Sequence, residues 1–172
     1  LAVPDRQAAE ALAEIRKRTD APLVADIHFD YRLALLALDA GVDKLRLNPG
    51  NIGGADRVRM VADRAKAAGV PIRIGVNSGS LERELLMKYG GPTAEAMVES
   101  ALGHAAILED AHFQDIVISI KGANPRTTVE ACRLLSSRCE YPQHTGVPDT
   151  GSGEEARVTS GAALGAQLYD GT

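Results

Sequence analysis

The sequence lacks tryptophan altogether, and aromatic residues make up only 3% of its 172 positions. Any hydrophobic core must therefore be built mainly from aliphatic side chains. Hydrophobic residues nevertheless reach 45%, and the net charge is only −4. These values exclude disorder for the chain as a whole, because disordered chains combine few apolar residues with high net charge. An aliphatic composition of this kind suits helices packed on a buried sheet.

Cysteine is almost as scarce. The two cysteines, Cys132 and Cys139, are too few for a disulfide framework. Their spacing matches neither a zinc site nor an iron–sulfur site. We interpret both as reduced structural thiols and predict no metal ligand in this chain.

Long apolar runs and basic clusters are missing as well. The longest apolar stretch, 33–38, is far too short to span a bilayer, and the N-terminus lacks the pattern of a signal peptide. No run of lysine and arginine offers a surface to nucleic acid. We therefore expect a cytoplasmic protein that binds neither membranes nor nucleic acid. The chain starts at Leu1 without a methionine, which suggests a processed or truncated chain.

Strand-like and helix-like segments alternate from end to end, with no linker between them. We predict strands over 23–27, 43–48, 72–77, 115–121 and 141–147, and helices over 8–18, 31–40, 55–68, 81–89, 93–110, 127–137 and 154–168. Residues 48–51 are predicted to form a loop. A serial βα pattern of this kind indicates a single α/β domain, in which helices cover a parallel sheet.

Polar side chains occupy one face of these strands near their carboxyl ends. In 72–77, for example, Arg73 and Asn77 alternate with isoleucine and valine. Parallel strands that are buried on both faces normally form nearly continuous apolar runs, so this row favours a site that faces a ligand. Ion pairing inside the fold is the alternative. The row consists of Asp26, His28, Arg46, Asn48, Arg73, Asn77, Lys121 and His144.

The charge of this row indicates the chemistry of its ligand. Arg46, Arg73 and Lys121 are cationic, whereas Asp26 is the one clear anion. A cationic site in an acidic protein points to an anionic ligand, and arginine offers the forked geometry that suits phosphate. The loop 48–54 precedes a helix and is placed to add backbone N–H donors.

Three segments give these residues a family context: PLVADIHFD at 22–30, KLRLNPGNIG at 44–53 and IRIGVNSGSL at 72–81. They strongly resemble the 4-hydroxy-3-methylbut-2-enyl diphosphate synthase family, and 92–101 and 115–121 continue the resemblance. The resemblance implies a TIM barrel that binds the cyclic diphosphate of methylerythritol. It also implies a smaller domain that holds a [4Fe–4S] cluster through three cysteines and a glutamate. Ferredoxin or flavodoxin would supply the electrons for a reductive ring opening in isoprenoid biosynthesis, in an enzyme expected to be a homodimer.

The resemblance also implies a role for each member of the row, since all eight would line the substrate site. The cationic side chains would neutralise phosphate, His28 and Asn77 would donate hydrogen bonds, and Asp26 would orient its neighbours. Asp149 takes the place of a family glutamate and is the catalytic candidate, although its carboxylate sits about one methylene short. Further departures are Ala123, where the family usually has serine, and Pro148, where it has threonine.

We therefore expect an α/β fold, an incomplete TIM-type barrel over 1–172 with about six of eight βα units and without the first and last strands. The iron–sulfur domain and its ligands would lie outside this chain. The chain would bind the diphosphate and be inactive alone. Two alternatives stay open. The chain could be a lyase or aldolase barrel that forms a Schiff base on Lys121, or a barrel that binds a diphosphate without catalysing a reaction.

Overall fold

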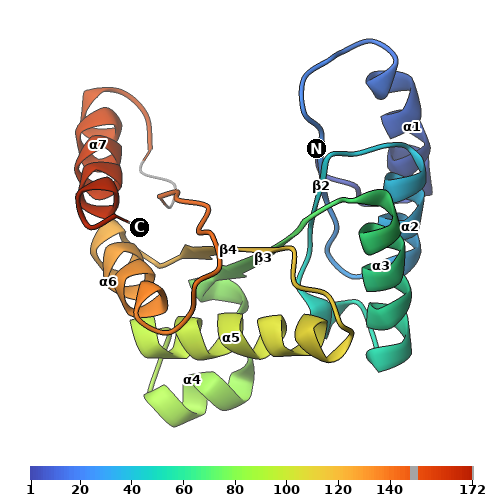
Figure 1. Ribbon diagram of the computed structural model, residues 1–172. Coiled ribbons are helices and arrows are strands. Elements are labelled where there is room, and N and C mark those ends of the chain that lie inside the picture. The colour runs from blue at the N-terminus through green and yellow to red at the C-terminus, as the bar shows by residue number, and fades with distance from the viewer. Residues whose placement is uncertain (148–150, 172) are drawn as a thin grey trace. The chain divides into compact units, whose positions relative to one another are not determined.

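The computed structural model describes residues 1–147 and 151–171, which form two compact units (Figure 1). The first unit comprises Leu1–Ile74 and His104–Val117. The second comprises Gly75–Gly103 and the described residues from Ile118 onward. Each unit mixes strand and helix, so both keep the α/β character that the sequence predicts.

Within residues 1–147 and 151–171 the sheet contains four strands in the order β1-β2-β3-β4. Their bounds are β1 Val24–Asp26, β2 Lys44–Arg46, β3 Ile72–Asn77 and β4 Ile116–Lys121. In the first unit β1 pairs in parallel with β2, and β2 in parallel with β3. Parallel neighbours joined through helices are the arrangement that the serial βα pattern predicts.

Seven α-helices occupy the described residues: α1 Arg6–Arg16, α2 Tyr31–Asp39, α3 Ala55–Ala68, α4 Arg83–Tyr89, α5 Ala94–Asp110, α6 Pro125–Ser136 and α7 Glu154–Tyr169. Two short 3₁₀ helices, η1 at Pro49–Asn51 and η2 at Ser78–Ser80, follow β2 and β3. In the first unit α1, α2 and α3 lie side by side (Figure 1), and in the second α6 packs on α7.

Local sequence explains where several helices begin and end. The side chains of Asp5, Asp30 and Asn124 accept backbone N–H bonds at the starts of α1, α2 and α6. Such caps satisfy donors that a helix N-terminus otherwise leaves unpaired. Helix α3 ends at Gly69, whose φ of +66° places it in the left-handed region that favours glycine.

The alternation of strands and helices is confirmed, but the strand predicted over 141–147 is wrong. Among the described residues this segment pairs only through an isolated bridge between Ile118 and Gln143. Pro142 lacks the N–H that a ladder needs, and Gly146 weakens extended structure. The predicted loop at 48–51 contains the 3₁₀ turn η1.

The core of the first unit lies under one face of its strands. Ala25, Leu45, Ile72 and Ile74 are fully buried, and α3 adds a buried stripe from Val58 to Ala65. On the alternate strand positions, side chains are only partly buried. The period-two pattern of the sequence therefore separates an apolar face from a polar one. Among the described residues no helix has both the length and the apolar character needed to cross a bilayer.

The left-handed conformation of Gly69 predicts that replacing it with alanine destabilises the fold. A Cβ at Gly69 would meet no atom within 4 Å, so Gly69→Ala tests backbone strain alone. We expect this change to lower the free energy of unfolding by about 1 kcal/mol in urea denaturation.

Gly103 provides the matched control, because it is exposed in the middle of α5 and a Cβ added there would also meet no atom within 4 Å. There Gly103→Ala should raise the free energy of unfolding by about 0.5–1 kcal/mol. Effects of the same sign at both glycines would contradict the assignment of strain to Gly69.

Candidate functional site

The strand register places three charged residues at one level of the sheet. Asp26 of β1 is the register partner of Arg46 on β2, and Arg46 is the partner of Arg73 on β3. Adjacent partners on parallel strands point to the same face. The structure therefore brings together an acidic and two basic side chains that lie 20 to 47 positions apart in the sequence.

Asp26 is the anionic centre of this group. Its Oδ1 accepts a hydrogen bond from Arg46 Nη1 at 2.9 Å, and His28 Nε2 lies 4.0 Å from the same oxygen. The Arg46 side chain is only 13% exposed, whereas that of His28 is half exposed. The carboxylate therefore holds a largely buried guanidinium in place, and it gains a second cationic neighbour whenever His28 is protonated.

Arg73 differs from Arg46 in how its guanidinium is satisfied. Its Nε is buried and has no hydrogen-bond partner among the described residues. Burial lowers the pKa of Arg73, the positive charge of Arg46 lowers it further, and Asp26 opposes both effects. An anion beside Arg73 would offset both the energetic cost of burying its charge and the repulsion from Arg46. It would also accept the hydrogen bond that Nε lacks.

Asn48 lies at the end of β2, where the chain turns into η1, and it is buried. The preceding Leu47 N–H donates to the Arg73 carbonyl at 3.0 Å, so the end of β2 is held against β3. In the next turn the Gly50 N–H donates to His104 Nδ1 at 3.3 Å. The first unit thus contains five of the eight residues of the predicted row: Asp26, His28, Arg46, Asn48 and Arg73.

The second unit contains the other three. Asn77 ends β3, Lys121 ends β4, and the His144 N–H donates to the Ile118 carbonyl at 2.8 Å. The segment after His144 runs close to Lys121, since a Cβ on Gly146 would lie 3.3 Å from Lys121 Cε. Within this unit the structure therefore places the lysine and the histidine segment next to each other. The catalytic candidate Asp149 lies outside the described residues.

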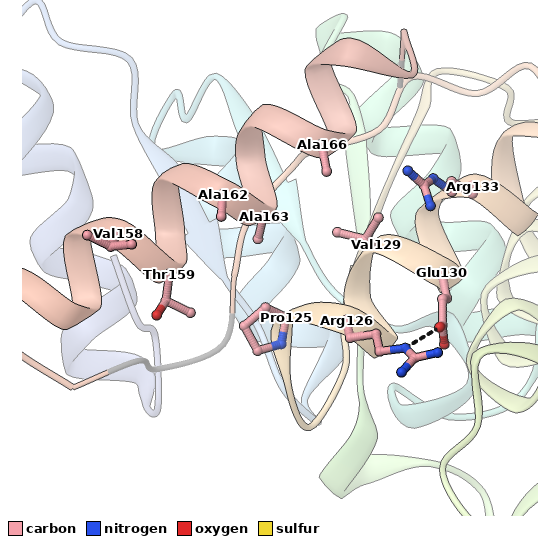
Figure 2. A pocket seen from close by; sticks show the side chains of 10 residues that line it. All are labelled: Pro125, Arg126, Val129, Glu130, Arg133, Val158, Thr159, Ala162, Ala163 and Ala166. Atoms are coloured by element: carbon pink, nitrogen blue, oxygen red, sulfur yellow. Dashed lines mark hydrogen bonds and ion pairs between the residues drawn. The ribbon is translucent and has the colours of Figure 1, made fainter.

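A separate groove of about 640 Å³ lies between α6 and α7 in the second unit (Figure 2). Figure 2 shows Ala162, Ala163 and Ala166 of α7 on the side toward Val129 of α6, with an Arg126–Glu130 ion pair of 2.8 Å at its edge. None of the residues of the predicted row lines this groove. The groove is therefore separate from the candidate site at the strand ends.

The described residues do not fit a [4Fe–4S] cluster. No group of three or more histidine, cysteine, aspartate or glutamate side chains is arranged there to hold a metal ion. Cys132 is buried, and burial raises the pKa of its thiol to about 11. The largest cause of this rise is desolvation, which is expected for a thiol packed in a core. The interpretation of Cys132 as a structural thiol agrees with this environment.

The raised pKa of Cys132 predicts its reactivity. At pH 8 the thiol remains protonated in the folded chain, so iodoacetamide should modify Cys132 far more slowly than the partly exposed Cys139. Mass spectrometry of time points measures both rates, and urea-unfolded protein is the control in which the two rates converge. Equal rates in the folded chain would contradict the burial of Cys132.

Solved structures share the overall fold of this chain. A 3-keto-L-gulonate-6-phosphate decarboxylase from Vibrio cholerae matches with a TM-score of 0.53 and 16% identity, over 95% of this chain and 79% of its own. A 2,3-dimethylmalate lyase of the PEP mutase/isocitrate lyase superfamily matches with a TM-score of 0.53 and 14% identity, over 94% and 59%. Identities this low indicate the fold alone and give no support to a Schiff base on Lys121.

Sequence relatives are much more similar. Proteins named "4-hydroxy-3-methylbut-2-en-1-yl diphosphate synthase (flavodoxin)" are 56% identical in Ruminiclostridium cellulolyticum and 54% identical in Maridesulfovibrio salexigens, each over 99% of this chain. The chain spans about half the length of these relatives, since the match covers 48% of each.

The family comparison covers the chain from end to end. The sequence pattern of the GcpE TIM-barrel domain matches residues 1–172. This match agrees with the parallel βα arrangement and with the fold of the solved structures. It confirms the predicted TIM-type fold class and the predicted family resemblance, and the chain accordingly belongs to the GcpE TIM-barrel domain family.

Proposed function

We propose that this chain is the substrate-binding barrel of a 4-hydroxy-3-methylbut-2-en-1-yl diphosphate synthase. In this proposal it binds 2-C-methyl-D-erythritol 2,4-cyclodiphosphate, which the complete enzyme converts to 4-hydroxy-3-methylbut-2-enyl diphosphate. The names of the relatives support the reaction. The observation that carries the binding role is the buried Arg73 Nε, which has no acceptor among the described residues and lies beside Arg46.

The electrostatics of the first unit favour a diphosphate. Asp26 holds Arg46 by a 2.9 Å hydrogen bond, so that guanidinium is fixed before any ligand arrives. Arg73 keeps a buried donor for the ligand itself. Fixed donors lose little conformational entropy when they bind, and hydrogen bonds between guanidinium and phosphate are among the stronger ones in proteins.

The remaining members of the row have narrower proposed roles. Lys121 would neutralise phosphate charge, and His28 and Asn77 would donate hydrogen bonds to the substrate. Asn48 and His144 would complete the lining of the site. We further propose that Asp149 takes the part of the family glutamate in the reaction.

The redox chemistry is assigned to other parts of the complete protein. The described residues do not fit the [4Fe–4S] cluster, so this chain would bind the substrate and would carry no electron-transfer step. The name of the relatives favours flavodoxin over ferredoxin as the electron donor. We expect the complete enzyme to act as a homodimer in the cytoplasm.

The first test removes the guanidinium of Arg73. We expect Arg73→Ala to weaken binding of the cyclic diphosphate by about tenfold to a hundredfold, because charge-assisted hydrogen bonds are lost. Isothermal titration calorimetry with the 172-residue chain measures the dissociation constant.

Arg64→Ala is the matched control, since Arg64 is a half-exposed arginine of α3 that pairs with Asp39 of α2. Its dissociation constant should stay within about twofold of the unaltered chain, in line with the small energies of surface ion pairs. Equal affinity of the Arg73→Ala variant and the unaltered chain would overturn the binding role.

The second test concerns the cluster. After reconstitution with iron and sulfide, we expect this chain to bind no stoichiometric iron and to reduce no substrate in the presence of a chemical reductant, because its two cysteines lack a third ligand. Iron analysis and product assay measure both, and the synthase from R. cellulolyticum serves as the positive control. If this chain alone binds a cluster and converts the substrate, the proposal that the redox chemistry belongs to other parts of the protein is wrong.

A further inference from the structure

His104 is a buried histidine that the predicted row does not include. It lies on α5 in the first unit, and only 6% of its surface is exposed. Its Nδ1 accepts a hydrogen bond from the Gly50 N–H at 3.3 Å. An imidazole that accepts at Nδ1 is neutral and carries its proton on Nε2. The contact joins α5 to the turn η1, which begins directly after Asn48.

The absence of a side chain at Gly50 leaves room for this contact. A Cβ at Gly50 would lie 2.8 Å from His104 Cε1 and 3.2 Å from Nδ1, which is closer than carbon atoms pack. The backbone of Gly50 does not have a positive φ, so glycine is required here by the approach of the imidazole and not by strain. Two residues 54 positions apart are therefore matched to each other.

Pro49 and Ile52 are buried and pack the two ends of the turn, whereas Gly50 between them is exposed. A cavity of about 290 Å³ lies beside it, between Pro49, Gly50 and Gly53 of the turn region and Ile107 and Ala111 of the α5 end. Gly50 has no side chain with which to pack against α5 across this cavity, so its backbone N–H is the group that links it to the helix. The hydrogen bond to His104 therefore adds a directional constraint at the one residue of the turn that has no side chain.

We propose that His104 is a positioning residue for the diphosphate site. By holding the Gly50 N–H it fixes η1, and through η1 it fixes Asn48 at the end of β2, two residues after Arg46. The carbonyl of Asn48 already accepts from the Asn51 N–H at 2.9 Å, so the turn and Asn48 move as one piece. The inference rests on the proposed function, because Asn48 has its role only if the row binds the substrate.

Three variants test whether the acceptor atom matters. His104→Leu keeps an apolar side chain of similar bulk but removes the acceptor, and His104→Asn keeps an acceptor oxygen near the place of Nδ1. We expect His104→Leu to weaken binding of the cyclic diphosphate about tenfold, and His104→Asn to remain within about threefold of the unaltered chain. Gly50→Ala should weaken binding as well, whereas Gly54→Ala, with open space around its Cβ, should not.

Thermal unfolding separates positioning from a purely structural role. Leucine suits a buried site better than asparagine, so His104→Asn should have the lower melting temperature while keeping the higher affinity. If affinity instead follows melting temperature across these variants, His104 acts through stability alone and the inference is wrong. Adding Gly50→Ala to a His104→Ala background should cost no further affinity, because the clash is gone.

Failure of the inference and failure of the proposed function give different results. If the unaltered chain binds the cyclic diphosphate and His104→Leu binds equally well, only the inference is refuted. If the unaltered chain does not bind it, the proposed function is refuted. In that case hydrogen exchange of the Gly50 amide still reports on the contact, and equal exchange rates in the Leu and Asn variants would refute the positioning of η1 as well.

Discussion

The parallel register of β1, β2 and β3 is the constraint on which the candidate site depends. It sets Asp26, Arg46 and Arg73 at one level, and it sends Ala25, Leu45 and Ile72 to the buried face. A shift of one residue in any strand would reverse both assignments, because side chains alternate with a period of two. The apolar face thus fixes the geometry of the polar one, and the ladder between β2 and β3 continues to the Leu47 N–H beside Asn48.

Charge balance then explains why this row suits an anion. One carboxylate faces two guanidinium groups, and Asp26 bonds to Arg46 while Arg73 keeps a buried Nε without a partner among the described residues. Unit charges about 4 Å apart interact by about 4 kcal/mol near a protein surface. Exposed helix pairs such as Arg6–Glu10 contribute about 0.3–0.5 kcal/mol. The group Asp26, Arg46 and Arg73 has one more cation than anion, whereas a surface pair such as Arg6–Glu10 is balanced, so the positive charge available to a phosphate lies in the row.

The sequence predicts the elements and the polar face well because both depend on local periodicity. Helix α3 and strand β3 have the predicted bounds, and the alternation around Arg73 predicts which side chains share a face. The prediction fails at 141–147, where Pro142 and Gly146 interrupt the ladder that the surrounding residues favour. Asp149 lies outside the described residues, so its predicted role stays a prediction.

Long-range matching is the part that sequence reasoning could not reach. The approach of Gly50 to His104 joins residues 54 positions apart, and neither residue has a local pattern that names the other. The glycine resembles an ordinary turn residue, and the histidine resembles an ordinary member of a helix. Only the short distance between Gly50 and the imidazole shows that the histidine excludes a larger residue at position 50. The end of β2 is therefore held from two sides, by the ladder to β3 and by the α5 imidazole. Such double support is what a preorganised anion site requires, since donors that are already fixed need not be ordered when the ligand binds.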